Sequence, residues 1–313
     1  MKAWMATGKP DEPLMLSDVP EPAPGADEVI VRVEAYSVNR GEMFALNGVY
    51  GTPAPEGWRP GQDVAGTVIQ AAPDGSGPPA GTRVTAHPQA AGWAERAAVP
   101  VSRLAELPGG FPAEVAAALP LAGLTALRLV RAAGNLAGRA VLLTGASGGV
   151  GHFLTELAAG NGAQVTVVAG TAERGRRLAE LGAQTAVRDV SDATGPFDII
   201  MESVGGKSLS AAMAKLSPGG TLLWYGQAGL EPSVLDFFQL FPVTPVTLRH
   251  FPHWVSDTID AEDLATLVRM TAAGQLHPEI GRSADWAQTA ALLNDVYQRR
   301  VRGHAVLTIS GTP

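Results

Sequence analysis

Cysteine is missing altogether from this chain of 313 residues. Its absence excludes disulfide bonds, thiolate nucleophiles and every zinc site that depends on Cys ligands. Histidine is scarce as well, and of the six present only His250 and His253 lie close together, with no third ligand near them. We therefore expect no bound metal.

Long apolar runs are also lacking, although 46% of the residues are hydrophobic, so no segment is expected to cross a bilayer. The first 14 residues carry a lysine but no apolar run or cleavage site, which favours a cytoplasmic location. The net charge is −7, and the arginines are scattered rather than gathered in a basic stripe. We expect neither nucleic acid nor a membrane as a partner.

The most informative stretch is residues 139–162, RAVLLTGASGGVGHFLTELAAGNG. An apolar run at 140–143 is followed by four glycines and then by apolar residues at helical spacing, which predicts a strand, a tight turn and a helix. Glycine permits positive φ and lets a diphosphate approach the backbone N–H groups at a helix N-terminus. The stretch therefore predicts a dinucleotide-binding loop at the start of a βαβ unit.

The same glycines allow two other interpretations. The run from Gly145 to Gly149 also fits the GxSxG turn of α/β-hydrolases, with Ser147 as nucleophile and Asp285 and His304 in the required order. A glycine-rich turn with no ligand is the second alternative.

A short-chain dehydrogenase is a further candidate, because TGASGGVG fits the TGxxxGxG pattern of that family. Its chemistry requires Tyr-x-x-x-Lys after the loop, since the lysine lowers the pKa of the tyrosine. Tyr225 and Tyr297 are followed four residues later by Gly229 and Val301, so this family is excluded.

The first hundred residues carry short strand signals separated by Pro/Gly clusters. The clearest is Glu28 to Val38, and others are expected at 3–5, 63–70, 82–86 and 93–99. Many short strands without helices between them predict a small antiparallel barrel. Residues 112–134 then change to a helical period that Pro120 interrupts.

From Arg139 onward strands and helices alternate, which predicts a doubly wound parallel sheet, because parallel neighbours need a crossover helix. We expect strands at 140–144, 164–169, 184–188, 197–201, 220–225 and 244–249, and helices at 149–159, 172–181 and 206–216. The last fifty residues predict helices at 260–270 and 285–299 and a strand at 305–309.

The end of the second strand of the βαβ unit indicates which nicotinamide cofactor is bound. An acidic residue there binds the ribose 2′-hydroxyl of NAD, but the strand here ends in Ala169-Gly170-Thr171. Thr171 can donate to a 2′-phosphate, and Arg174, with Arg176 and Arg177 near it, can neutralise that phosphate. The pattern favours NADPH, whereas a solvated helix face is the other interpretation of these arginines.

A series of blocks along almost the whole chain resembles the zinc-independent branch of the medium-chain dehydrogenase/reductases, the quinone oxidoreductase or zeta-crystallin-like group. The blocks are YSVN (36–39), GQDVAG (61–66), GTRV (81–84), ALPLAGLTAL (118–127), TGASGGVG (144–151), ESVGG (202–206), SPGG (217–220) and RGHAVL (302–307). The resemblance implies an α/β protein with a GroES-like antiparallel β-barrel domain, formed by residues 1–122 and 261–313, and a Rossmann NADPH-binding domain, residues 123–260. It also implies a homodimer.

The resemblance further implies the site residues. Positions that bind the catalytic zinc in zinc-dependent relatives match Asn39 and Gln62 here, so the substrate oxygen must be polarised by hydrogen-bond donors. The substrate-side residues are then Asn39, Arg40 and Tyr50. The cofactor-binding residues are Thr125, Gly148, Gly149, Val150, Gly170, Thr171, Arg174 and Gly226. The chain departs from the family pattern at Arg188 and at His304, so the roles of these two residues stay open.

Together these features predict an NADPH-dependent oxidoreductase that transfers hydride, without a metal, to a small electrophile, either a quinone or an α,β-unsaturated carbonyl. Asn39 and Tyr50 would hold the charge that develops on the conjugated oxygen while solvent supplies the proton. The alternatives are a serine hydrolase and an NADPH-binding sensor protein with little turnover.

Overall fold

The computed structural model describes residues 1–240 and 245–309. The chain forms two compact units: Met1–Leu124 together with Thr258–Pro313 make up unit 1, and Thr125–Asp257 make up unit 2. The boundary at residue 124 falls inside one helix, α3 (Pro120–Ala133). Among the described residues no helix is both long and apolar enough to cross a membrane.

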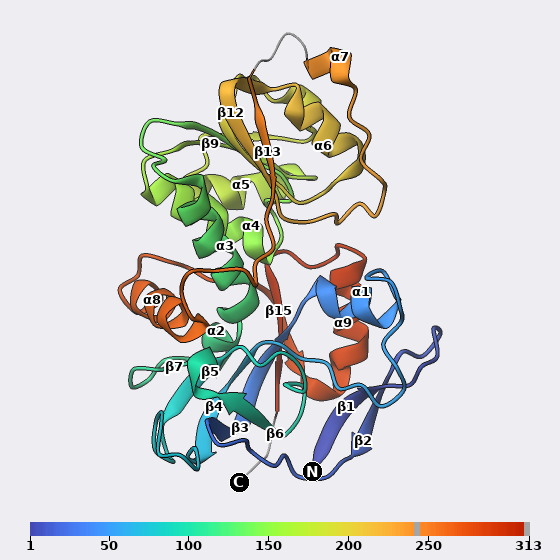
Figure 1. Ribbon diagram of the computed structural model, residues 1–313, viewed down its shortest axis with the longest axis vertical. Coiled ribbons are helices and arrows are strands. Elements are labelled where there is room, and N and C mark those ends of the chain that lie inside the picture. Colours follow the sequence, from blue (N-terminus) through green and yellow to red (C-terminus); the bar gives the residue numbers. More distant parts are fainter. Residues whose placement is uncertain (241–244, 310–313) are drawn as a thin grey trace. The chain divides into compact units, whose positions relative to one another are not determined.

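Unit 1 is built around β3 (Glu28–Val38), which has the bounds that the alternating pattern predicted (Figure 1). One edge of β3 pairs antiparallel with β4 (Val64–Gln70). The first half of the other edge of β3 pairs antiparallel with β6 (Arg96–Pro100), and the second half pairs antiparallel with β15 (His304–Thr308). The remaining strands of the unit are β1 (Lys2–Ala6), β2 (Leu14–Asp18), β5 (Arg83–Ala86), β7 (Leu104–Glu106) and β14 (Ile280–Asp285). The predicted antiparallel sheet is confirmed, with one parallel pair added, β14 on β15.

Seven apolar residues of β3 are buried, and so is Ser37. Both faces of this strand therefore lie in the core of unit 1. Tyr36 stacks on Trp93, with ring centroids 5.9 Å apart. The indole Nε1 of Trp93 donates to the carbonyl of Ser37 at 3.0 Å. Burial of an aromatic ring of this size, with its one polar atom satisfied, stabilises the centre of the sheet.

The α-helices in the described part of unit 1, besides the first turn of α3, are α1 (Arg40–Leu46), α2 (Ala113–Ala117), α8 (Asp260–Ala272) and α9 (Thr289–Tyr297). Three strands, β2, β7 and β14, and the short helix α1 were not predicted. The predicted helix from 285 to 299 begins as a 3-10 turn, Trp286–Gln288, which Asp285 caps by accepting a hydrogen bond from Ala287 N–H at 2.9 Å. Helix α9 therefore begins only at Thr289.

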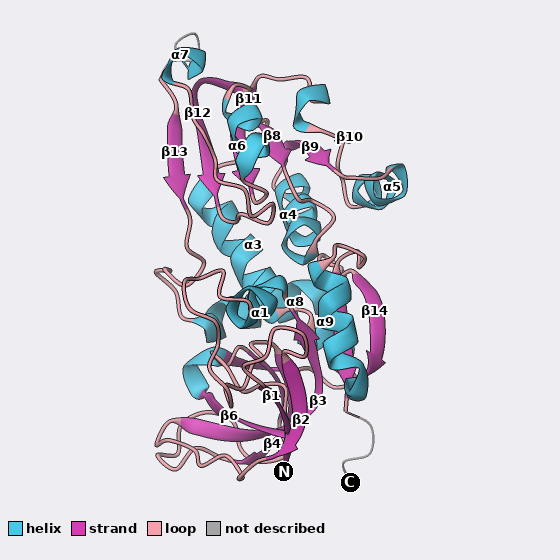
Figure 2. Cartoon of the chain, turned by 90° about the vertical axis from the view of Figure 1, so that its right-hand side faces the viewer, coloured by secondary structure: helices cyan, strands magenta, loops and turns pink. Residues whose placement is uncertain are grey.

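Unit 2 contains a six-stranded parallel sheet in the order β10-β9-β8-β11-β12-β13, shown side by side in Figure 2. Its strands are β8 (Ala140–Leu143), β9 (Gln164–Val168), β10 (Thr185–Val187), β11 (Phe197–Glu202), β12 (Leu216–Trp224) and β13 (Thr247–His250). Its helices are the rest of α3, α4 (Gly149–Gly160), α5 (Ala172–Glu180), α6 (Gly206–Met213) and α7 (Phe237–Leu240). This order is that of a doubly wound Rossmann sheet, which confirms the predicted fold class. Residue 244, where the sixth strand was expected to begin, lies outside the described residues.

The Trp93 contact gives a test of this core. Replacing Trp93 with Phe removes the hydrogen bond to Ser37 and leaves unfilled volume, so the free energy of unfolding should fall by about 2–4 kcal/mol. Urea denaturation followed by circular dichroism measures the change. Trp254 is 71% exposed and serves as the control, since Trp254→Phe should leave the transition in place. Equal effects of the two substitutions would contradict this account of the core.

Candidate functional site

The polar loops of unit 2 meet at the carboxyl edge of the parallel sheet, where the strand order reverses between β8 and β11. Thr144 follows β8, and its hydroxyl donates to the Glu202 carboxylate at the end of β11, at 3.1 Å. The N–H of Ser203 in turn donates to the Thr144 hydroxyl at 3.0 Å. In sheets of this type a ligand binds in the crevice at such a reversal.

The glycine turn after β8 has the geometry that the sequence predicted. Gly145 has φ of +60°, and a Cβ on Gly151 would stand 2.5 Å from the backbone of Ala146. Gly148 is the N-cap of α4, and no side chain caps this helix. The N–H groups of the first turn, including those of Gly149 and Val150, have no partner within the helix and form a site for an anion.

Arg174 joins the end of β9 to this turn. Thr171 caps α5 by accepting a hydrogen bond from Arg174 N–H at 3.3 Å. Gly170, the residue before Thr171, is exposed. The guanidinium Nη1 of Arg174 donates to the hydroxyl of Ser147 at 3.3 Å. The structure therefore brings together the cation and the glycine turn, which the sequence separates by more than twenty residues.

A hollow of about 290 Å³ lies beside the carboxyl ends of β9 and β10. Its lining includes Thr171, Arg176 and Arg188. Alanine, glycine and valine make up most of the lining, and the two arginines give the hollow positive charge. It has the charge expected of a site for a phosphate on a ribose.

The two remaining predicted cofactor residues lie in different surroundings. Gly226 follows β12, and a Cβ there would stand 3.1 Å from the carbonyl oxygen of Ser203, so this loop packs closely on the loop after β11. Thr125 is a buried residue of α3. Its role toward the cofactor stays a prediction.

Sequence reasoning missed Glu202, a fully buried carboxylate that holds the loop after β11 in place. Besides Thr144, it accepts hydrogen bonds from the N–H groups of Val204 and Gly205, each at 3.0 Å, and from Ser208 at 2.9 Å. The signal that could have found it is an acidic residue at the end of an apolar strand, followed directly by small residues.

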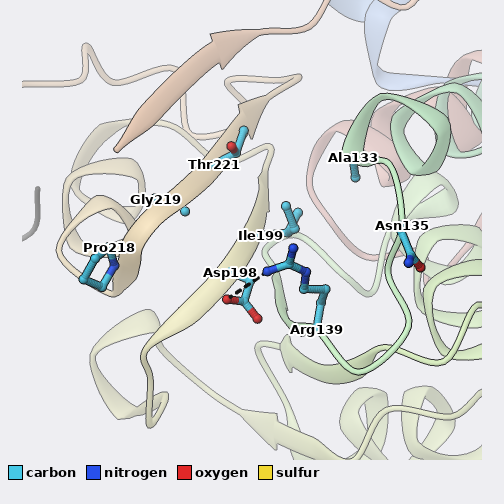
Figure 3. Close-up of a pocket in the computed structure, with 9 residues that line it drawn as sticks. Ala133, Asn135, Arg139, Asp198, Ile199, Pro218, Gly219 and Thr221 are labelled. Carbon is cyan, nitrogen blue, oxygen red and sulfur yellow. Dashed lines mark ion pairs between the residues drawn. The ribbon is translucent and has the colours of Figure 1, made fainter. Parts of the chain in front are cut away.

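The opposite edge of this sheet also has a pocket, of about 240 Å³ (Figure 3). Arg139 forms an ion pair there with Asp198, at 3.7 Å. The Asp198 carboxylate also accepts from Ala140 N–H at 3.0 Å and from Ser217 at 3.1 Å. These contacts join the amino ends of β8, β11 and β12, so the polar residues of this pocket maintain the sheet.

Unit 1 contains a buried polar cluster around Asp63, in the loop before β4. Its Oδ2 accepts from the Ser37 hydroxyl at 2.6 Å and from the Asn39 side-chain amide at 2.7 Å. Its Oδ1 accepts from Leu121 N–H at 2.7 Å and lies 3.6 Å from His87 Nδ1. Burial by itself raises the pKa of Asp63, but the nearby His87 and the hydrogen bonds from Asn39 and Ser37 outweigh burial, so this pKa lies below its ordinary value.

The other two predicted substrate-side residues flank α1 and differ in their contacts. Tyr50 is 71% exposed, and its ring meets that of Phe44 edge to face, at 5.9 Å. The Arg40 guanidinium lies over the rings of Phe44 and Tyr297, at 5.5 and 5.4 Å. Arg40 thus packs between α1 and α9, whereas most of the Tyr50 side chain is exposed.

The serine hydrolase alternative requires Asp285 to orient His304, and the structure separates these two residues. In the β14–β15 pair, His304 lies opposite Ile280 and Asp285 lies opposite Thr308, at the two ends of the pair. His304 Nδ1 pairs with the carbonyl of Glu279 at 3.1 Å. The catalytic triad of this alternative is therefore not formed.

In the described part of the chain, no group of three His, Cys, Asp or Glu side chains could hold a metal ion. At the two positions that match zinc ligands, Asn39 is bonded to Asp63, and the backbone carbonyl of Gln62 accepts from His87 Nδ1 at 2.7 Å. A carbonyl oxygen can only accept, so Nδ1 of His87 carries a proton.

Comparisons with known proteins agree with this architecture. Residues 25–120 match the model of the alcohol dehydrogenase GroES-like domain, and residues 149–272 match that of the zinc-binding dehydrogenases. Over 235 residues the chain is 32% identical to the quinone oxidoreductase of Rattus norvegicus, covering 71% of each chain. It is 26% identical to the acryloyl-coenzyme A reductase of Sulfurisphaera tokodaii over 315 residues, covering 90% of this chain and 91% of that protein.

Among solved structures, the quinone oxidoreductase of Thermus thermophilus, which was also determined in complex with NADPH, is similar over the whole chain. The TM-score is 0.81 at 28% sequence identity, with 99% of this chain and 100% of that chain covered.

The Asp63 cluster gives a test that depends on pH. Asp63→Asn replaces one accepting oxygen with an amide NH₂ group, which can only donate. This NH₂ group then faces the donors that the oxygen bound, so the free energy of unfolding at pH 7 should fall by about 3 kcal/mol. Because folding lowers the pKa of Asp63, its contribution is present above the ordinary value of 3.8 and is lost as the pH falls through the lower folded value. The difference in melting temperature between wild type and variant should therefore shrink from pH 7 to pH 3. Asp11→Asn, at an exposed aspartate, is the control, and a difference that did not change with pH would refute the assignment.

Proposed function

The chain belongs to the quinone oxidoreductase branch of the medium-chain dehydrogenase/reductase family, and on this basis we propose that it is an NADPH-dependent reductase. It transfers hydride, without a metal, to the electron-poor carbon of a quinone or of an α,β-unsaturated carbonyl. The contact between Arg174 and Ser147 is the observation that carries this proposal, because it joins a phosphate-binding cation to the glycine turn.

The residues of unit 2 fit NADPH. The uncapped first turn of α4 offers the N–H groups of Gly149 and Val150 to the diphosphate. No carboxylate stands at the end of β9 to repel a 2′-phosphate, and Thr171 and Arg174 are there to bind it. Arg176 and Arg188 line the adjoining hollow and add positive charge.

On the substrate side, Asn39 and Tyr50 are the proposed hydrogen-bond donors. The bound reduced nicotinamide supplies hydride. One N–H of the Asn39 amide goes to Asp63, which fixes the amide plane and leaves the second N–H for the conjugated oxygen of the substrate. Preorganised donors of this kind stabilise the negative charge that develops on that oxygen.

Two substrate classes share this chemistry. Quinones and enoyl thioesters both carry an oxygen conjugated to the carbon that accepts hydride, and relatives named for a quinone and for acryloyl-coenzyme A support both. We propose further that the protein acts in the cytoplasm as a homodimer. The edge strand β13, which pairs with β12 on one side, supports the dimer, and analytical ultracentrifugation tests it.

The cofactor assignment predicts a selective loss of affinity. Arg174→Ala removes a charge-assisted bond to the 2′-phosphate, so the Kd for NADPH should rise about 10- to 100-fold while the Kd for NADH stays the same. Quenching of tryptophan fluorescence measures both constants. Arg177, which pairs with Glu180 at 2.8 Å on the same helix, gives the control Arg177→Ala. A parallel loss of NADH affinity would argue against recognition of the 2′-phosphate.

The proposed donors predict a loss of turnover. Asn39→Ala and Tyr50→Phe should each lower kcat by about 10²-fold with the Kd for NADPH unchanged, because each removes a bond that strengthens as charge develops. NADPH oxidation with 1,4-naphthoquinone and with 3-buten-2-one gives the rates. If both variants kept wild-type turnover with every substrate, the donors would be wrongly assigned. If wild type bound NADPH but oxidised none of it, a sensor protein would be the better interpretation.

A further inference from the structure

Glu42, in the first turn of α1, is a buried acid whose Oε2 completes a capping box with Asn39, but the capping box does not account for its complete burial or for its second oxygen. It is 2% exposed. Its Oε2 accepts from Asn39 N–H at 2.9 Å, while Oε1 is buried without a hydrogen-bond partner among the described residues. An ionised carboxylate with one unmatched oxygen is costly in such a place, whereas a neutral carboxylic acid is tolerated.

The charges around Glu42 favour the same neutral form. Burial, and then the negative charge of Asp63, raise the pKa of Glu42 to about 8. The pKa of Asp63 itself is lowered, as described above. Two neighbouring carboxyl groups are thus separated into one proton carrier and one permanent anion, an arrangement typical of acid–base sites.

Other titratable groups stand around this pair. Those that act on Asp63 or Glu42, or that flank α1, are Tyr50, His87 and His304, with Arg40, Tyr297 and Arg299 on the side of α9. Desolvation lowers the pKa of the buried His304. Arg40 is held over aromatic rings, so Asp63 is the charge that acts on Glu42.

Tyr50 connects Glu42 to the surface. Its hydroxyl lies over the first turn of α1, 3.4 Å from the point where a Cβ on Gly41 would stand. Partial burial, and then the charge of Glu42, raise the pKa of Tyr50. No hydrogen bond joins Tyr50 to Glu42 among the described residues, so a bridging water or a turn of the largely exposed Tyr50 side chain would connect the buried acid to a substrate.

We propose that Glu42 stores the proton for the reduction and delivers it to the substrate oxygen through the Tyr50 hydroxyl. This inference rests on the proposed function, with NADPH as the reductant, and replaces solvent as the immediate proton donor. Addition of hydride to the β-carbon forms a C–H bond and shifts the π pair to the conjugated oxygen. Tyr50 gives its proton to that oxygen and receives one from Glu42, which is left as a carboxylate and regains a proton from water.

The test compares Glu42→Gln, Glu42→Asp, Tyr50→Phe and the double variant Glu42→Gln/Tyr50→Phe, with the exposed Glu56→Gln as control. On the protein without cofactor, infrared spectra from pH 6 to pH 10 follow the C=O band of a protonated carboxylic acid. On the protein with saturating NADPH, kcat/KM for 1,4-naphthoquinone and 3-buten-2-one is measured over the same range. Tryptophan quenching checks that the NADPH affinity is intact.

We expect the infrared band in wild type, its loss as the pH rises through about 8, and its absence from Glu42→Gln. The kcat/KM of wild type should fall over the same pH range, and Glu42→Gln should remove this dependence and lower kcat about 10²-fold. Glu42→Asp should recover part of the rate. The double variant should be no slower than either single variant, because the two groups act on the same proton.

Several outcomes would overturn the inference. The first is that wild type shows no infrared band of a protonated carboxylic acid. The second is that Glu42→Gln keeps the kcat and the pH dependence of wild type. The third is that the rate losses of Glu42→Gln and Tyr50→Phe multiply in the double variant. Failure of the proposed function is a separate result: wild type would then bind no NADPH or reduce neither probe, and both proposals would fall together.

Discussion

The buried carboxylate of Asp63 is the constraint on which unit 1 depends. Its two oxygens bind the Ser37 hydroxyl at the end of β3, the Asn39 amide at the start of α1 and the Leu121 N–H at the start of α3. The segment at residues 37–39 and the start of α3, more than eighty residues apart in the chain, are thus held by one anion in the loop before β4. Because a buried charge is tolerated only when it is well bonded, these segments keep a single arrangement.

Unit 2 uses a similar device at the carboxyl edge of its sheet. Glu202 binds Thr144 after β8 and the N–H groups of Val204 and Gly205 after β11. The glycine turn and the neighbouring loop are therefore held together before any ligand arrives. A rigid loop loses little conformational entropy when it binds a cofactor, which favours affinity.

The absence of zinc ligands changes the electrostatics of the substrate side. At one of the two positions that match zinc ligands, Asn39 is oriented by an anion, and a neutral amide directed by a buried carboxylate can donate to a substrate oxygen without adding net charge. Burial, and then the charge of the same anion, raise the pKa of Glu42. Asp63 thus both orients a donor and holds a neighbouring acid in its protonated form.

Sequence reasoning found most of the backbone elements and the glycine turn, and it failed at α1. This helix has only seven residues, too few for a helical period to emerge. The Asn39-x-x-Glu42 spacing is nonetheless similar to a capping box and could have indicated its start. Arg40 packs over Tyr297, a contact that spans more than 250 residues and that no local pattern encodes, and its role toward the substrate stays a prediction.

The sequence by itself determined the two kinds of sheet, the phosphate-binding turn and the lack of an acidic residue after β9, because each depends on neighbours within a few residues. Only the tertiary structure decided that Arg174 reaches Ser147, that Asp285 and His304 lie at opposite ends of a strand pair, and that the pKa of Glu42 is raised. These properties arise from burial and from charges brought near by folding. Local periodicity carries no information about either.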